Sequence, residues 1–364
     1  MQKISIFIPV YRESDLLDDI LKSLLEDTYN NKEIITVVDE PTENSLGLVK
    51  RYKSHVKFIL NRKRKGKVKA LNEAVKHSNG EILLFLDADV KIPEGDKNFL
   101  GKIVKSMKNC DILEIKKRII KNSLLSRLVS YDYIAFNFIE WAFCKKLKKC
   151  IGVNGAAFAI KREVFYEVGM FKKIVDEDLE IGAQAFFKNK KFKYAENIEV
   201  LNKAPNSWKH WFKQRKRWGV GFAVYLNKHY RDFAEYFLKC PQILAPLLPF
   251  LLPNLFLIFS TVFMLAGFTH ISIPLSATSS GANRLLSLHF ATIILSWNVS
   301  VYLGFFVIFF IVFFAAARKL KYEFSLPELF VYVFFYYPIS MLVYTLCFVR
   351  VFVFSDYRVE DWKV

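Results

Sequence analysis

Charged residues are missing from three long stretches of this 364-residue sequence. Residues 241–283, 285–317 and 329–349 contain no Asp, Glu, Lys or Arg. A membrane-spanning helix needs about 20 apolar residues, so each stretch is long enough to cross a bilayer. We predict spans near residues 243–268, 289–316 and 328–352. Four prolines in the first stretch, at positions 241, 246, 249 and 253, leave a kinked or re-entrant helix open as its alternative.

Cysteine pairs are also missing. The five cysteines form no CxxC pair and no cluster with histidine, which excludes the usual zinc motifs and a disulfide framework. This pattern fits a reducing, cytosolic side. The N-terminal run MQKISIFIPVYRESD contains too short an apolar stretch for a signal peptide and favours a buried first strand.

The charges that are present gather in the first two thirds of the chain. The sequence has 53 Lys and Arg against 35 Asp and Glu, and residues 241–364 hold only 7 against 5 of them, which leaves a net charge of +16 on residues 1–240. Nucleic acid, an anionic membrane surface and phosphorylated substrates all bind such a surface, and charge alone does not choose between them.

The loop between the second and third predicted spans carries Arg318, Lys319 and Lys321, whereas the loop after the first span has no charge before Arg284. The positive-inside rule then places the basic loop and residues 1–240 in the cytoplasm. We therefore expect a multi-pass protein of the cell membrane. An odd number of spans sends the tail, residues 355–364, to the outside.

Residues 1–240 alternate between short apolar strands and amphipathic helices. KISIFIPV, EIITVVD, KFIL and EILLFLD read as strands, and residues 14–27 read as a helix with Ser14 as its cap. This alternation predicts a mostly parallel α/β sheet. The expected domains are residues 1–205 (α/β domain), 206–242 (interfacial amphipathic helices), 243–354 (transmembrane domain of about three helices) and 355–364 (tail).

Ligands of open α/β sheets bind at the carboxyl ends of the strands. In this sequence those positions are residues 9–13, the pair Asp39 and Glu40, the run NRKRKGKVK, and the pair Asp87 and Asp89. Two carboxylates spaced by one residue after a buried strand are suitable ligands for a divalent cation that also holds phosphate oxygens. The basic run precedes a helix and suits phosphate, although a solvated loop is the alternative for most of its side chains. Lys67 is its strongest phosphate candidate.

Several ordered motifs between residue 4 and about residue 225 resemble the family 2 glycosyltransferases with a GT-A fold. They are IPVYRE, VVDEPTEN, RKGKVKALNEA, FLDAD, GAAFAIKREVFYEVGMF, DEDLEIG and QRKRW. Such enzymes take a sugar from a nucleotide diphosphate. The resemblance therefore implies a GT-A catalytic domain, a nucleotide-sugar donor and a magnesium or manganese ion.

The resemblance also implies roles on the donor side. Pro9, Tyr11 and Glu13 would line the nucleoside pocket, and Asp39 would contact the base, with a mild preference for a UDP-sugar. Lys67 would reach the diphosphate. In the DxD motif Asp89 would be the direct metal ligand, and Asp87 would contact the ribose or donor and support the metal.

Further along the chain the resemblance implies the acceptor side. Asp178 would be the catalytic base, which takes a proton from the acceptor hydroxyl in one inverting displacement. Glu177, Gln214 and Trp218 would contact the acceptor, and Arg217 would face the diphosphate. Gln184 departs from the family, which often has Arg there. The segment around QRKRW also reads as an interfacial amphipathic helix, and both interpretations can hold together.

The leading hypothesis is a cytoplasm-facing membrane enzyme that passes one sugar to a lipid-linked acceptor: a polyprenyl phosphate, a glycolipid or a lipid-linked oligosaccharide. A processive polysaccharide synthase is the alternative within the same enzyme class, because it shares the QxxRW motif. A transporter or a non-enzymatic basic membrane protein is the alternative from another class. We expect no nucleic-acid partner, since the basic half lacks a nucleic-acid-binding motif.

Overall fold

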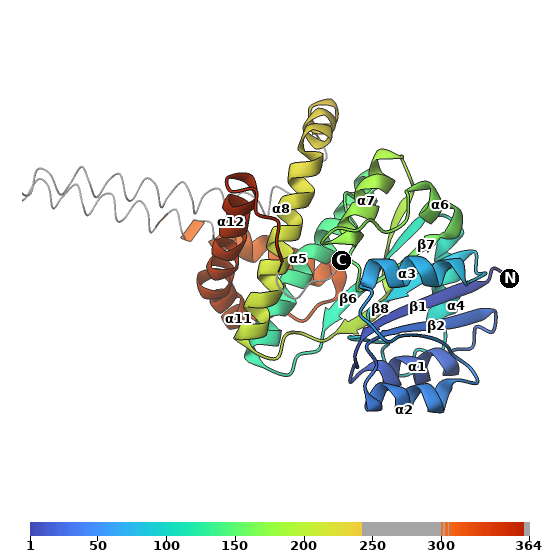
Figure 1. Cartoon of the computed structure of the whole chain (residues 1–364). Helices are drawn as coiled ribbons and strands as arrows, with labels where there is room; N and C mark the ends of the chain where they lie inside the picture. The colour runs from blue at the N-terminus through green and yellow to red at the C-terminus, as the bar shows by residue number, and fades with distance from the viewer. Residues whose placement is uncertain (242–299, 301–302, 305, 360–364) are drawn as a thin grey trace, which may run out of the picture.

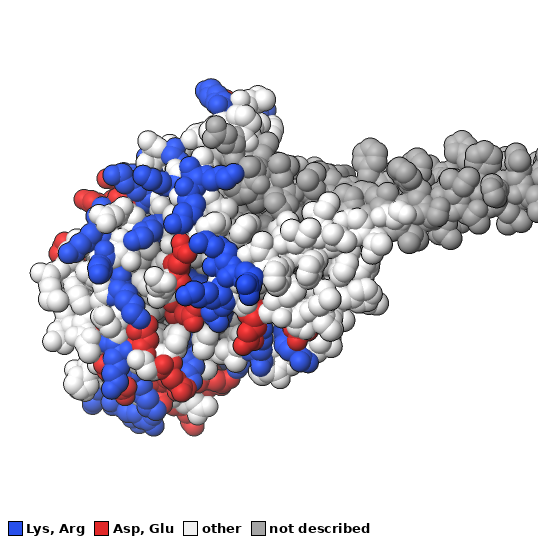
Figure 2. All heavy atoms as spheres, turned by 180° about the vertical axis from the view of Figure 1, so that it is seen from behind, with Lys and Arg blue, Asp and Glu red and all other residues white. Residues whose placement is uncertain are grey.

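The computed structural model describes residues 1–241, 300, 303–304 and 306–359. In this part of the chain a mixed sheet carries helices on both faces, and a group of long helices follows it (Figure 1). The first predicted span and half of the second, 289–316, lie outside the described residues. Seen from behind, charged side chains are spread over the sheet domain, whereas the surface of the C-terminal helical part is almost uncharged (Figure 2).

The sheet has eight strands in the order β3-β2-β1-β4-β7-β6-β8-β5. Strands β1 to β4 are mutually parallel, β7 is antiparallel to β4 and β6, and β8 is parallel to β6 and antiparallel to β5. The sheet is therefore mixed, and the predicted parallel order holds for its N-terminal half. The strands are β1 (Ile4–Tyr11), β2 (Lys32–Asp39), β3 (Lys57–Asn61), β4 (Ile82–Leu86), β5 (Val90–Lys91), β6 (Ile112–Ile119), β7 (Ala157–Lys161) and β8 (Phe192–Asn202).

Hydrophobic alternation in the strands builds one core on each face of the sheet. In β1, Ile6 and Ile8 pack into the cluster that contains helix α1 (Leu17–Glu26) and helix α4 (Phe99–Met107). Phe7 points to the opposite face, where it joins helix α3 (Lys67–Lys76) and stacks on Phe85 of β4. Successive side chains of a strand point to opposite faces, so a strand apolar at every position is buried on both.

The four predicted strands are confirmed as β1 to β4, and the predicted helix 14–27 is confirmed as α1. The expected cap is wrong: α1 begins at Leu17, its cap residue is Leu16, and no side chain caps it. Ser14 instead donates a hydrogen bond from Oγ to the carbonyl oxygen of Ala88, 2.5 Å away. The side chain therefore ties the end of β1 to the loop that contains the DxD motif.

The helices that follow the sheet domain are long. Helix α5 (Leu124–Leu147) is largely buried and packs on β6 and β8. The described residues of the predicted segment 206–242 contain the long helix α8 (Trp208–Lys239). Further helices are α2 (Glu43–Tyr52), α6 (Arg162–Glu167), α7 (Glu177–Phe187), α11 (Leu326–Val331), the π-helical turn η2 (Tyr332–Tyr336) and α12 (Tyr337–Phe352), and residues 306–320 are helical as well.

Residues 326–352, formed by α11, η2 and α12, are the one candidate membrane helix within the described residues. This helix has 27 residues, and an 18-residue stretch of it has a mean hydropathy of 1.7, so the helix is long and apolar enough to cross a bilayer. The predicted third span, 328–352, coincides with it. In the fold α12 runs alongside α8 (Figure 1).

Candidate active site

The carboxyl ends of β1 and β2 lie side by side, because Tyr11 is paired with Asp39 in the sheet register. Beyond each end the backbone turns sharply, with Arg12 at φ 65° and Glu40 at φ 53°. Non-glycine residues seldom adopt this left-handed conformation, and it is often kept where function requires it. The predicted strand-end residues are therefore brought to one edge of the sheet.

Asp39 fixes the basic loop that follows β3. Its buried carboxylate accepts hydrogen bonds from the backbone N–H of Lys65 and of Gly66, both at 2.9 Å, and from the side-chain amide of Asn61 at 2.8 Å. A carboxylate can accept about four hydrogen bonds, so these three N–H donors occupy most of its acceptor sites. Asp39 thus shapes the loop that begins α3, and its contact with a base stays a prediction.

Tyr11 and Glu13 lie near this loop and near α2. The guanidinium of Arg64 lies over the half-exposed ring of Tyr11, 4.3 Å from the ring centroid. The hydroxyl of Tyr11 donates a hydrogen bond to Glu40 at 3.2 Å. Glu13 accepts hydrogen bonds from Thr42 at 2.7 Å and from the amide of Asn44. The predicted nucleoside residues therefore surround one loop junction and already have polar partners there.

Lys67 lies at the centre of the site. It is the first residue of α3, after Gly66 at φ 89°, and its ammonium is 2.8 Å from Asp87 Oδ1 and 3.1 Å from Glu177 Oε1. Burial opposes the charge, but Asp87, Glu177 and Asp178 raise the pKa of Lys67 above its usual value. Lys67, Asp87 and Glu177 also line one small enclosed cavity together with Pro9.

Asp87 and Asp89 follow β4 and suit a divalent cation. Although Asp89 is exposed, the protein around it and the charge of Asp87 raise its pKa to about 6, against the opposing charges of Lys67 and Arg217. No group of three or more His, Cys, Asp or Glu in the described part of the chain could hold a metal. Two carboxylates completed by substrate phosphates are the usual arrangement for Mg²⁺, so the pair fits the predicted ion.

Asp178 lies at the start of α7, with Glu177 beside it. Its carboxylate accepts the backbone N–H of Gly155 at 2.6 Å and that of Leu179 at 2.9 Å. Burial and the charge of Glu177 raise the pKa of Asp178, and Lys67 opposes this. A raised pKa brings a carboxylate closer to the value that suits a general base.

Asp176 precedes this pair and has a different environment. Its carboxylate lies against α8, where a Cβ added to Gly221 would be 2.2 Å from Oδ2. Burial and the charge of Asp178 raise its pKa well above the usual value, whereas Arg217 lowers it. Arg217 is thus close enough to influence both Asp89 and Asp176, which brings the QRKRW segment to the edge where the DxD motif lies.

The other QRKRW residues divide between two sides of α8. Trp218 is half-buried, and its ring centroid is 4.6 Å from the guanidinium of Arg215. Gln214 is partly buried, and its Oε1 accepts no hydrogen bond within the described residues. Of the predicted acceptor residues, Gln214 and Trp218 are therefore one turn apart on α8, whereas Glu177 begins α7, and the contact of all three with an acceptor stays a prediction.

Arg215 is a residue that sequence reasoning missed. It is fully buried and binds Asp132 of α5 at 2.6 Å and the hydroxyl of Tyr336 at 2.9 Å. Tyr332 and Tyr336 also donate to Asp132, and Trp211 donates to Tyr336. The available signal was Asp132 itself, a lone acidic residue in the otherwise apolar run LVSYDYIAFNFI.

A second feature that sequence reasoning missed is a buried ion pair whose lysine is influenced by the charge of Asp178. Lys117 of β6 is buried in contact with Glu114, which accepts the backbone N–H of Asn154 at 3.1 Å. Burial lowers the pKa of Lys117 to about 8, although Glu140, Asp178 and Asp87 oppose this. Alternation along β6 gave no reason to expect a buried lysine at this position.

With this geometry in view, the sequence was compared with known proteins. Residues 5–169 match the family described as Glycosyl transferase family 2. The chain carries a family 2 glycosyltransferase domain. This domain extends from β1 to α6 and includes Lys67, Asp87 and Asp89, whereas Asp178 and QRKRW follow it.

Curated relatives agree with this assignment. The chain is 25% identical over 275 residues to "Probable glycosyltransferase YdaM" of Bacillus subtilis (strain 168), covering 72% of this chain and 65% of the relative. It is 23% identical over 260 residues to the poly-beta-1,6-N-acetyl-D-glucosamine synthase of Staphylococcus aureus (strain MSSA476), covering 67% and 62%. The chain thus spans less than two thirds of the length of these relatives.

A solved structure shares the fold. The mannosyltransferase PcManGT from Pyrobaculum calidifontis, solved in complex with GDP-Man and Mn²⁺, matches with a TM-score of 0.53 and 18% identity. The match covers 89% of this chain and 88% of that one. The glycosyltransferase domain therefore has the GT-A-like α/β architecture expected from its motifs.

Gly155 offers a test of how Asp178 is positioned. A Cβ at this residue would lie 2.7 Å from Asp178 Oδ2, so Gly155→Ala should displace the carboxylate. A displacement near 1 Å lowers turnover by about 10²-fold, which is the fall in kcat we expect in a sugar-transfer assay, with the thermal midpoint kept. Gly47→Ala is the matched control, because its Cβ meets nothing within 4 Å. Unchanged kcat in Gly155→Ala would contradict the assigned position.

The buried pair offers a test of stability. Asp132→Ala leaves Arg215 buried without its carboxylate, which should cost about 3–5 kcal/mol and lower the thermal midpoint of the detergent-solubilised protein. The double variant Asp132→Leu/Arg215→Met removes both charges and should recover much of the loss. Glu235→Ala, which breaks an exposed pair with Lys239, should leave the midpoint unchanged. Equal midpoints for Asp132→Ala and Glu235→Ala would refute the role of the buried pair.

Proposed function

We propose that this chain is an inverting, metal-dependent membrane glycosyltransferase that transfers a sugar from a nucleotide diphosphate to a lipid-linked acceptor. The observation that carries the proposal is the convergence of Lys67, Asp87 and Glu177 within 3.1 Å at the strand ends of a family 2 domain, with Asp178 beside them. A cation among several carboxylates at this edge suits a substrate that has both phosphates and a reacting hydroxyl.

On the donor side, Lys67 and Arg217 would bind the diphosphate. Asp89, assisted by Asp87, would hold Mg²⁺ or Mn²⁺, and the ion when bound would offset charge on the leaving diphosphate. Asp87 already shares Lys67, which leaves Asp89 as the freer carboxylate of the two for an ion. The mannosyltransferase with the same fold was solved with Mn²⁺, which supports an ion of this kind.

Pro9, Tyr11, Glu13 and Asp39 would form the nucleoside pocket. The exposed part of the Tyr11 ring provides a flat surface for a base, and Arg64 shows that a planar group stacks there. The sequence mildly favours a UDP-sugar, whereas the mannosyltransferase was solved with GDP-Man. A panel of nucleotide sugars, with release of nucleotide as the readout, distinguishes the two donors.

Asp178 would take the proton of the acceptor hydroxyl as that oxygen attacks the anomeric carbon. The sugar–phosphate bond breaks on the opposite side of the ring, so one displacement inverts the anomeric configuration. Two backbone N–H groups hold the carboxylate in place, and Glu177 is its neighbour. Glu177, Gln214 and Trp218 would then contact the acceptor.

The acceptor would be a polyprenyl phosphate, a glycolipid or a lipid-linked oligosaccharide in the cell membrane. The closeness of QRKRW to the apolar helix 326–352 supports this, because Trp211 and Arg215 of α8 both contact Tyr336. The chain would be a multi-pass membrane protein with its catalytic domain in the cytoplasm. The basic loop supports that side, since Arg118 of the sheet domain donates to the carbonyl of Lys321 at 2.6 Å.

A processive polysaccharide synthase is the second candidate function. Similarity to the poly-beta-1,6-N-acetyl-D-glucosamine synthase of Staphylococcus aureus favours it, since the name of that relative states a polymer product. The match of residues 5–169 to family 2 glycosyltransferases argues against a non-enzymatic basic membrane protein or a transporter. Both remaining candidates use the same donor and the same base, and they differ in how often the acceptor is extended.

Replacement of Asp178 tests the proposed base. Asp178→Asn should lower kcat by about 10²- to 10⁴-fold, because general-base catalysis contributes that much, while Mn²⁺ with nucleotide diphosphate still raises the melting temperature. Asp176→Asn is the matched control and should keep most of the activity, since Asp176 lies against Gly221. Loss of activity in Asp176→Asn together with normal turnover in Asp178→Asn would reverse the assignment.

The size of the product separates the two candidate functions. Purified protein with a radiolabelled nucleotide sugar and a lipid-linked acceptor should yield an acceptor extended by one sugar. Chromatography of the lipid fraction and gel filtration of the aqueous fraction would measure this. A ladder of long polymers would instead favour the polysaccharide synthase.

A further inference from the structure

The apolar helix 326–352 has two clearly different faces. One face points away from the protein and is apolar except for Thr345, with Phe335, Leu342 and Leu346 exposed to 61%, 60% and 60%. The other face is packed on α5 and α8 and contains the buried tyrosines of η2. Exposed apolar positions recur every three to five residues, at Phe330, Phe335, Ile339, Leu342, Leu346, Val349 and Phe352, which defines a single outer stripe.

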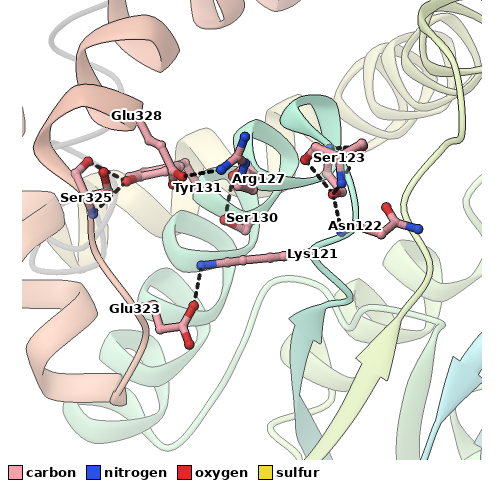
Figure 3. A network of polar contacts seen from close by, with 10 residues as sticks. Lys121, Asn122, Ser123, Arg127, Ser130, Tyr131, Glu323, Ser325 and Glu328 are labelled. Atoms are coloured by element: carbon pink, nitrogen blue, oxygen red, sulfur yellow. Dashed lines mark hydrogen bonds and ion pairs between the residues drawn. The ribbon is translucent and has the colours of Figure 1, made fainter.

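The beginning of this helix is tied to the sheet domain (Figure 3). Tyr131 of α5 donates to the carbonyl of Ser325 at 2.7 Å, and the N–H of Ser325 donates back to the same hydroxyl. Arg127 is 3.6 Å from Glu328, and Lys121 pairs with Glu323 at 3.0 Å. The first turn therefore lies on the side of the membrane where the catalytic domain lies.

The end of the helix is tied to the same side. Cys347 donates from Sγ to the carbonyl of Lys216 in α8, and a Cβ added to Gly219 would be 2.9 Å from that sulfur. Val351 is buried against Val220 and Ala223 of α8. The tail residue Val359 packs against the same cluster, so the chain after the helix also lies on α8.

These contacts are incompatible with a helix that crosses the bilayer. The hydrocarbon core is about 30 Å thick, so the two ends of a spanning helix face opposite aqueous sides. Here α8 accompanies the helix from Tyr336 to Val351, and α8 exposes Lys209, Lys213 and Lys216. A crossing would carry these lysines into hydrocarbon, where charged side chains are strongly disfavoured.

We propose that residues 326–352 lie in the plane of the membrane surface, with their outer stripe in the lipid monolayer, and that the tail stays on the catalytic side. The proposal rests on the membrane location in the proposed function and replaces the third predicted span. Lipid is the occupant that fits the outer stripe, because the only polar side chain on this face is the uncharged Thr345 and the adjoining α8 supplies lysines for anionic headgroups. The helix would thus hold QRKRW at headgroup depth.

Sidedness of the tail tests the proposal directly. Full-length protein with Tyr357→Cys is labelled with a membrane-impermeant maleimide in sealed inside-out vesicles, with Ser54→Cys in the exposed loop after α2 as reference. We expect both to be labelled to the same extent, above the background of the native cysteines. Protection of Tyr357→Cys with labelling of Ser54→Cys would overturn the in-plane helix alone. Protection of Ser54→Cys, or release of the protein by carbonate, would instead overturn the membrane location in the proposed function.

Depth of the outer stripe provides a second measurement. A fluorophore is attached to a cysteine introduced at one of three positions, by Phe330→Cys, Leu342→Cys or Phe352→Cys. Spin-labelled lipids then quench it at known depths. An in-plane helix predicts the same shallow depth at all three positions, whereas a spanning helix predicts the greatest depth at Leu342 and would refute the proposal. Ser340→Cys on the buried face is the control and should be quenched least, because only 3% of Ser340 is exposed.

Discussion

The placement of one positive charge organises the candidate active site. Lys67 is held between Asp87 from the end of β4 and Glu177 from the start of α7, which are 90 residues apart in the sequence. Without this ammonium, the carboxylates at positions 87, 89, 177 and 178 would repel one another at a single edge of the sheet. Asp39 fixes Lys67 indirectly, since its hydrogen bonds shape the loop before α3. The end of β4 and the start of α7 are therefore electrostatically coupled through Lys67.

Local pattern was enough to predict the parts of the fold that are hydrophobic and near in sequence. The four apolar runs became β1 to β4, and the strand-end rule brought Asp39, Lys67 and Asp87 to one edge. Pattern did not predict the antiparallel insertion of β7 between β4 and β6, because pairing of distant strands depends on tertiary packing. It also misplaced the cap of α1, since Ser14 donates to the carbonyl of Ala88 and accepts from the N–H of Leu16, which precedes the helix, rather than from an N–H within it.

Buried polar residues were the least predictable part of the site. Asp132, Arg215 and Tyr336 come from three separate segments, and each by itself looked like an exception in an apolar or basic stretch. Such groups are tolerated in a protein interior only when they meet, and no single segment reveals its partner. The QRKRW motif illustrates the limit: its Arg217 could be assigned from the resemblance, whereas its Arg215 acquires a role only through α5 and η2.

The same buried network joins the apolar helix 326–352 to the helix that carries QRKRW. Arg215 lies between the rings of Trp211 and Trp218 and binds residues of both α5 and η2. Helix α8 then continues past Gly219, which permits close contact with Cys347, and Gly221, which permits close contact with Asp176. A shift of the apolar helix would move α8 through the contacts of Arg215 with Tyr336 and of Gly219 with Cys347, and α8 would transmit the shift to Asp176 through Gly221. Because close-packed interiors transmit strain, the apolar helix and the carboxylates at the start of α7 share one mechanical reference, namely α8.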